Sequence, residues 1–428
     1  MRRRLLTVCL AVAAACSQQS NPAPDAGGGP DAGSPTDAGP CGPLTDTLQR
    51  CAVDPLVHGW YALPGIGQGW TAADPKVLFD ASAGLWKAWW STVETNVCDL
   101  TLETTDNEID IMYAESPDGL TWTMQLTPAF RSHYASGAWD YSTVETPTVI
   151  QVPDAGASQR FALLYAGANN QKTDAGFALP RVAGNPPWQL GLAYSADGKS
   201  FTRLPAAQSP YFGRPTPFGS LDGLVLYVAD ALPAFPQAVY GGLADPDIIQ
   251  VGSTYHLFFS SAGTDALGHV IVDGGAIAYG IGHATSTDLI HWTADPGNPL
   301  LVGGGQPSVV LADGGTSLQM YFSRDSASDL VGIPSGVFQT RGFYRATSTD
   351  ASQWQVDATR EWVWDGTSLP EDLGLLRGAS AVVHAGELRL YYGAWTDQNV
   401  PPGSCLILAS GAVGPGVQVL NLARKRAP

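Results

Sequence analysis

Short apolar stretches that end at glycine, serine or aspartate dominate the chain, and the segment from Ala244 to Trp292 has the clearest pattern. An apolar stretch at 248–251 ends at Gly252, an aromatic stretch follows at 255–259, and a third covers 276–285. Short strand-forming stretches separated by turn residues are typical of an antiparallel meander. The segment has no apolar residues at helical spacing over more than two turns. It is therefore predicted to consist of β-strands.

The same order of elements recurs along the chain. A first element, usually with a proline before an apolar stretch, occurs at 74–77, 145–149, 245–248, 306–309 and 377–381. A second element occurs at 85–90, 161–166, 255–260, 318–323 and 388–393. The third element ends four times in the pattern Ser-x-Asp-x-x-x-aromatic, at Ser116/Asp118/Trp122, Ser195/Asp197/Phe201, Ser286/Asp288/Trp292 and Ser348/Asp350/Trp354. In the fifth unit, where this pattern is absent, we expect the third element at 406–410.

These repeats predict an all-β fold, a five-bladed β-propeller of four-stranded antiparallel blades over 70–428. One sheet cannot bury both of its faces alone, so neighbouring sheets must stack around an axis. Prolines in the first elements fit strands that begin at a central channel, where pairing on one side is incomplete. We expect the four repeated aspartates to accept backbone N–H groups in turns, and the aromatic residues to pack between blades.

Composition and charge exclude several classes of partner. The chain has 39 acidic residues against 22 lysines and arginines, a formal net charge of −17, so nucleic acid and anionic lipid are poor partners. No internal apolar stretch approaches the length needed to cross a bilayer. With 428 residues, 44% of them hydrophobic, the chain can form one large core, and we expect a monomer.

The N-terminus has the features of an export signal. Three arginines precede an apolar stretch at 5–15, which ends in three alanines before Cys16. This resembles a bacterial lipoprotein cleavage site, although Ala13 stands where such sites usually have leucine. We therefore expect a signal peptide at 1–15, a lipidated Cys16, a disordered tether at 16–40 rich in Pro, Gly, Asp and Ala, and an edge segment at 41–69. Ordinary cleavage after Ala15, which would give a secreted protein, is the alternative to a periplasmic, outer-membrane or cell-surface lipoprotein.

Export permits disulfide bonds. Apart from Cys9 in the signal and Cys16, the four remaining cysteines allow three pairings. Cys41 and Cys51 are close in the sequence and are expected to close a small loop. Cys98 and Cys405 belong to the first and last predicted blades, so a bond between them would link the two ends of the ring.

Three motifs carry a resemblance to a known group of enzymes. They are Ala-Asp-Pro before an apolar strand (Asp74 and Asp245), Glu-x-Pro (Glu145), and the Ser-x-Asp-x-x-x-Trp pattern. Through them the chain, from about 70 to 422, resembles the five-bladed β-propeller glycoside hydrolases, the arabinanase, levansucrase and invertase group of family 43 and family 32 types. The resemblance implies an oligo- or polysaccharide partner, no cofactor and three carboxylates. One aspartate is base or nucleophile, one aspartate tunes a pKa, and a glutamate is the general acid.

The chain departs from the pattern of that group in two places. The group has the order Asp, Asp, Glu along the chain, whereas here the order is Asp74, Glu145, Asp245. Ala73 also stands where the group often has a histidine. We expect Asp74 to be the base or nucleophile, Glu145 the leading candidate for the acid, and Asp245 the alternative acid or the residue that tunes a pKa.

The physical chemistry of such a site does not depend on the resemblance. First strands converge on the propeller axis, and glycoside cleavage needs one protonated and one ionised carboxyl group. Like charges held close together push their pKa values apart. The other two first elements begin with Gln306 and Arg377, which we expect to hold a substrate hydroxyl or offset the acidic charge. Trp70, Trp139 and Tyr240 are candidates for stacking against a sugar.

Other interpretations of the same residues remain open. The acidic residues also fit a channel that binds a glycan without cleaving it, or one that holds a Ca or Na ion. No Cys-x-x-Cys or His/Cys cluster indicates a structural metal site. A sialidase is a further alternative, because the segment from Asp118 to Trp122 resembles the Asp-box turn. That chemistry requires an arginine triad, and Arg377 stands nearly alone in the right place.

Overall fold

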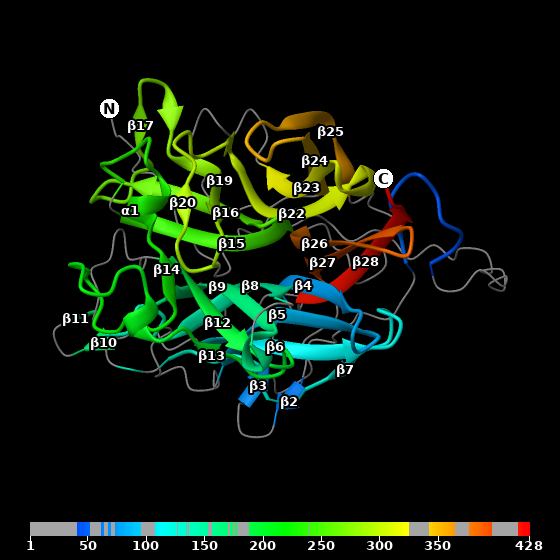
Figure 1. Ribbon diagram of the computed structural model, residues 1–428, viewed down its shortest axis with the longest axis horizontal. Helices are drawn as coiled ribbons and strands as arrows, with labels where there is room; N and C mark the ends of the chain where they lie inside the picture. The colour runs from blue at the N-terminus through cyan, green and yellow to red at the C-terminus, as the bar shows by residue number, and fades with distance from the viewer. Residues whose placement is uncertain are drawn as a thin grey trace, which may run out of the picture.

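The structure is a computed structural model, shown in Figure 1, and it is nearly all β. It describes residues 41–51, 61–63, 67–69, 73–95, 108–125, 127–133, 135, 137–152, 156–169, 172–173, 176–177, 188–238, 240–324, 342–363, 376–395 and 418–428. Within these residues the helical elements are the four-residue α1 (Val228–Ala231) and three short 3₁₀ turns. The expectation of an all-β chain is confirmed.

Most strands form five groups of consecutive antiparallel neighbours, here called units one to five. Units one and two belong to one sheet, in which a parallel bridge joins Ile109 to Thr143. Unit one contains β4 (Ala73–Asp80), β5 (Leu85–Thr95), β6 (Glu108–Ser116) and β7 (Thr123–Met124). Unit two contains β8 (Thr143–Gln151), β9 (Phe161–Ala168), β12 (Gln189–Ser195) and β13 (Thr202–Arg203). Unit three contains β15 (Tyr240–Val251), β16 (Thr254–Thr264), β19 (Tyr279–Ser286) and β20 (Thr293–Ala294). Unit four contains β22 (Gly304–Ala312), β23 (Ser317–Arg324), β24 (Gly342–Ser348) and β25 (Gln355–Val363).

Unit five combines both ends of the described sequence. Its strands are β26 (Leu376–His384), β27 (Glu387–Trp395), β28 (Gln418–Arg426) and the N-terminal β1 (Gln49–Arg50), which pairs with β28. The third strand is therefore β28 rather than the expected segment 406–410, which lies outside the described residues. A disulfide links Cys41, before β1, to Cys51, directly after β1, and closes a small loop as expected. Cys98 and Cys405 lie outside the described residues.

The first strands of the five units are neighbours. Their contacts run from β4 to β8, β15, β22 and β26 and then back to β4, and Figure 1 shows these strands near the middle of the molecule. Buried side chains link them. The Val309 N–H donates to Asp247 Oδ2 (2.6 Å), the Ala381 N–H to Ser308 Oγ (2.9 Å), and the Val77 N–H to Ser380 Oγ (2.9 Å). Asp247, Ser308 and Ser380 thus each join one first strand to another.

The repeated aspartates stabilise turns, as predicted. Asp118 Oδ1 accepts the N–H groups of Leu120 and Thr121, both at 2.8 Å, and Asp288 and Asp350 make the same pair of bonds in their own units. The aromatic residue that follows packs against a neighbouring unit. Trp122 contacts Tyr391 of unit five, and Trp354 contacts Phe258 of unit three, in both cases edge to face. These contacts confirm the structural role predicted for the repeat.

The segment between units two and three packs into the protein core. Its β14 (Leu224–Leu226) pairs with β12, and its apolar side chains join a cluster with Leu243, Leu257 and Phe259 of unit three. Among the described residues, no helix has the length and apolar character needed to cross a membrane. The predicted signal peptide and tether, 1–40, lie outside the described residues.

Candidate functional site

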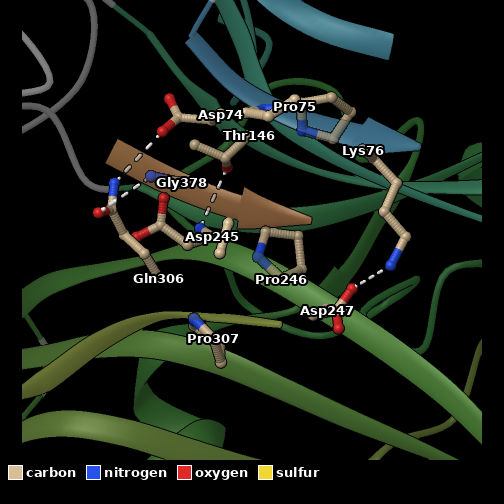
Figure 2. Close-up of a pocket in the computed structure, with 12 residues that line it drawn as sticks. Asp74, Pro75, Lys76, Thr146, Asp245, Pro246, Asp247, Gln306, Pro307 and Gly378 are labelled. Carbon is tan, nitrogen blue, oxygen red and sulfur yellow. Dashed lines mark hydrogen bonds and ion pairs between the residues drawn. The ribbon is translucent and has the colours of Figure 1, made fainter. Parts of the chain in front are cut away.

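An open pocket lies where the first strands begin (Figure 2). Its empty volume, including the part open to solvent, is about 300 Å³. All five first strands contribute to it. The lining residues are Asp74, Pro75, Lys76, Thr146, Pro147, Asp245, Pro246, Asp247, Gln306, Pro307, Gly378 and Ala379.

A repeated backbone irregularity builds this pocket. In each first strand the pairing with the second strand shifts register once. The residue at the shift has a positive φ, a conformation that most side chains avoid. These residues are Asp74 (49°), Thr146 (49°), Asp245 (48°), Gln306 (53°) and Gly378 (53°). The recurrence at five equivalent positions places one such residue per unit at the pocket.

This geometry corrects the alignment expected from the sequence. The last paired residues before the shift are Ala73, Glu145, Ala244, Gly305 and Arg377. Glu145 and Arg377 therefore correspond to Ala73, one position before Asp74. The counterpart of Asp74 in unit two is Thr146, and in unit five it is Gly378. The sequence alignment was wrong by one residue in these two units.

Asp74 is the second residue of β4 and is held by residues of units four and five. The Gln306 side-chain amide donates from Nε2 to Asp74 Oδ1 at 3.2 Å (Figure 2). Gly378 lies against the other side, because a Cβ atom at that position would be 2.7 Å from Asp74 Cα and 2.8 Å from Oδ1. The Asp74 side chain thus occupies space that only a glycine at 378 leaves open.

Asp245, the second lining carboxylate, begins the central part of β15. Ser260 on β16 donates from Oγ to Asp245 Oδ2 at 2.6 Å. The Asp245 N–H donates to Thr146 Oγ1 at 3.1 Å, which ties β15 to β8. Two aspartates from different units therefore line one pocket, and a neutral side chain hydrogen-bonds to each of them.

The pocket also contains an ion pair that the sequence analysis missed. Lys76 Nζ bonds to Asp247 Oδ1, and the two side chains are 11% and 4% exposed. Thr148 donates to the same oxygen at 3.1 Å. A comparison of the position two residues after each positive-φ residue would have revealed this set, because the side chain there is polar within an apolar strand. The residues at this position are Lys76, Thr148, Asp247, Ser308 and Ser380.

Other predicted site residues lie elsewhere. Glu145 is completely buried and does not belong to the pocket lining, so the expectation that three acidic residues share the open pocket is wrong for Glu145.

Trp139 is also fully buried, stacks on Tyr165 and donates to the Asp222 carbonyl, so it is wrongly predicted to stack on a sugar. Tyr240 is 36% exposed at the start of β15 and does not line the pocket. Trp70 and the side chain of Arg377 lie outside the described part of the structure.

The arrangement can carry out carboxylate chemistry. Two carboxyl groups on rigid strands, open to solvent on one side, can bind sugar hydroxyls or exchange protons with a bound molecule. Among the described residues, no group of three or more His, Cys, Asp or Glu side chains is placed to hold a metal ion.

Several solved structures have a similar fold. The structure of a BT0996 RGII complex matches with a TM-score of 0.57 and 14% identity, over 90% of this protein and 92% of the other. A second structure, of a glycoside hydrolase, matches with a TM-score of 0.56, 14% identity and the same coverage of both proteins. Zg3597, a family 117 glycoside hydrolase of the marine bacterium Zobellia galactanivorans, matches with a TM-score of 0.52 and 13% identity. The match covers 89% of this protein and 91% of Zg3597. The protein shares its overall fold with these three structures.

The sequence comparisons give no closer assignment. No family model matches the sequence, and no curated protein matches it. At 13–14% identity the structural likeness concerns the fold alone. The narrower resemblance to family 43 and family 32 enzymes stays a prediction.

Proposed function

We propose that the protein is an exported glycoside hydrolase, built as a five-bladed propeller, that cleaves a glycan in the pocket between Asp74 and Asp245. The observation that carries the proposal is the presence of two carboxylates from different strands in one open pocket. The closed sequence of contacts among the five first strands supports five blades around an axis. The shared fold with glycoside hydrolases supports a glycan as the substrate.

The proposed reaction assigns one role to each aspartate. Asp74 acts as the base or nucleophile, as its Asp-Pro position predicts, and Asp245 acts as the acid. The acid donates its proton to the glycosidic oxygen as the bond from that oxygen to the anomeric carbon breaks. The oxygen of a water molecule bonds to the anomeric carbon as a hydroxyl group, and the other proton of that water is taken up by a carboxylate. Glu145 is not assigned the acid role, because its side chain has no exposed surface.

A second candidate function is glycan binding without cleavage. It is favoured by the burial of Glu145, since the resemblance implies a glutamate as the acid and the described pocket lining contains none. In this case Asp74 and Asp245 would accept hydrogen bonds from sugar hydroxyls, and no bond would break.

Activity measurements on variants separate the two functions. We expect Asp74→Asn and Asp245→Asn each to lower turnover of the oligosaccharide that the wild type cleaves, among arabinan, xylan and fructan oligomers, by about two to four orders of magnitude. Binding of the uncleaved oligosaccharide, measured by calorimetry, should persist. Asp273→Asn, on the exposed strand β17 (Val272–Asp273), is the control and should leave turnover unchanged.

Two results would contradict the proposed hydrolase. Turnover unaffected by either pocket variant would place the chemistry elsewhere. Wild-type protein that binds an oligosaccharide but does not cleave it would support the binding function instead.

A further inference from the structure

Gln306 lies between the two lining carboxylates and is connected to both. Its side-chain Nε2 donates to Asp74 Oδ1 at 3.2 Å. Its backbone N–H donates to Ser260 Oγ at 2.8 Å, and Ser260 in turn donates to Asp245 Oδ2 at 2.6 Å. A continuous path of hydrogen bonds therefore runs from Asp74 through Gln306 and Ser260 to Asp245.

The orientation of the Gln306 amide is fixed by its other contacts. Oε1 accepts hydrogen bonds from Ser323 Oγ at 3.0 Å and from the Gly378 N–H at 3.3 Å. The Gly378 N–H can only donate and an ionised Asp74 carboxylate can only accept, so Oε1 faces Gly378 and Nε2 faces Asp74. Both acceptor positions of the oxygen are used within the protein, and the residue is 7% exposed. This bonding pattern favours a role inside the site over the predicted direct contact with a substrate hydroxyl.

We propose that Gln306 is a positioning residue that fixes Asp74 and Asp245 relative to each other; this rests on the proposed hydrolase function. The two aspartates belong to units one and three, while Gln306 belongs to unit four, so no local segment holds them together. A reaction that uses an acid and a base on either side of one bond needs their separation to be set closely. Gln306 sets it through one direct bond and one bond relayed by Ser260.

A substrate-free experiment tests the contact to Asp74. Thermal unfolding is measured for Gln306→Leu, Asp74→Ala and the double variant. We expect the loss of Tm caused by Gln306→Leu to be smaller in the Asp74→Ala background, by about 2 °C or more, because the bond is already absent there. Gln319→Leu is the matched control. Gln319 is 6% exposed on β23 of the same unit and interacts with Tyr321, so its effect should add to that of Asp74→Ala.

Gln306→Glu tests the positioning role through pH. The introduced carboxyl group can donate to Asp74 when protonated and repels it when ionised. We expect kcat/KM at pH 7 to fall about 100-fold, the scale of a misplaced catalytic group. The ratio of variant to wild-type kcat/KM should then rise about tenfold or more between pH 7 and pH 5. Gln319→Glu, away from the pocket, should keep the wild-type pH profile.

The outcomes separate this inference from the proposed function. Additive Tm losses for Gln306→Leu and Asp74→Ala would overturn the positioning role whether or not a substrate is known. A Gln306→Glu variant with the wild-type kcat and pH profile would also overturn it. Wild-type protein that cleaves no glycan would instead overturn the hydrolase function. Gln306 would then have no role in catalysis, even if the Tm losses were coupled.

Discussion

A glycine and an aspartate from opposite ends of the sequence fit against each other at the pocket. Gly378 has a φ of +53°, and a Cβ atom there would meet Asp74 at 2.7 Å, a distance that real Cβ contacts do not reach. We therefore expect Gly378→Ala to displace Asp74 and lower both stability and turnover. The strained backbone alone costs about 1–2 kcal/mol, and the clash adds to this.

Gly252→Ala provides the matched control for that variant. Gly252 has a similar φ of +61°, but a Cβ atom there would meet no heavy atom within 4 Å. Urea unfolding should show a larger loss of stability for Gly378→Ala than for Gly252→Ala, and only the former should lose turnover. Equal losses of stability with turnover intact would mean that Asp74 does not depend on this close contact.

At the residue scale, the sequence predicted some pocket residues and misplaced others for an identifiable reason. Asp74, Asp245 and Gln306 each immediately precede a proline, and all three line the pocket. Glu145 lies two positions before its proline, so alignment on the proline would have selected Thr146. The sequence prediction chose the acidic residue, Glu145, over the residue at the matching distance from the proline, Thr146. Ser260 was not predicted, because it lies on a second strand and only folding places it beside Asp245.

The elements themselves follow the sequence pattern closely. Short apolar stretches between turn residues became strands, because alternating side chains cover both faces of a sheet packed between neighbours. The error in unit five has a topological cause. β28 takes the place next to β27, and β1, from the other end of the described sequence, supplies the outer strand. Pairing between distant segments of this kind depends on how the ends meet, which local patterns do not encode.

A pair of strands in unit three carries the clearest pH-sensitive contact. His283 on β19 is 3.1 Å from His256 on β16, measured from Nε2 to Nδ1, and stacks on Phe258. Burial and the neighbouring His256 lower the pKa of His283 to about 4, against the opposing effect of the nearby Asp295 and Asp350 carboxylates. Burial also lowers the pKa of His256. Both shifts favour the neutral form of the histidines in the folded protein.

The sign of the resulting pH dependence follows from proton binding. Between pH 6.5 and about 4 the unfolded protein binds a proton at residue 283 and the folded protein does not, so stability falls as the pH falls through this window. We expect His283→Gln to reduce the loss of Tm between pH 7 and pH 4. His384→Gln, which also removes an imidazole packed against an aromatic ring, is the control for the loss of ring packing. An unchanged slope in His283→Gln would show that other groups cause the acid sensitivity.

At the scale of the whole molecule, repetition made the architecture predictable. Four copies of one turn pattern and five first elements indicated a repeating all-β protein before any contact was known. The contacts between first strands are consistent with that arrangement, because they close on themselves from β26 to β4. The pocket residues were harder to predict, since a pocket between units depends on register shifts within each strand.

The last expectation concerns where the protein is held in the cell. Three arginines, an apolar stretch and three alanines before Cys16 indicate export with a lipid on that cysteine, and the Pro- and Gly-rich 17–40 segment suits a tether. We expect Cys16→Ser to move the protein from the membrane fraction to the soluble fraction, because a serine hydroxyl cannot form the thioether link to the lipid. Cys9→Ser, inside the apolar stretch, is the matched control and should leave the protein with the membrane. Fractionation followed by mass measurement of the mature N-terminus decides the matter. A wild-type protein that is soluble and begins at Cys16 without added lipid mass would show that cleavage releases it, and the lipid anchor would be ruled out.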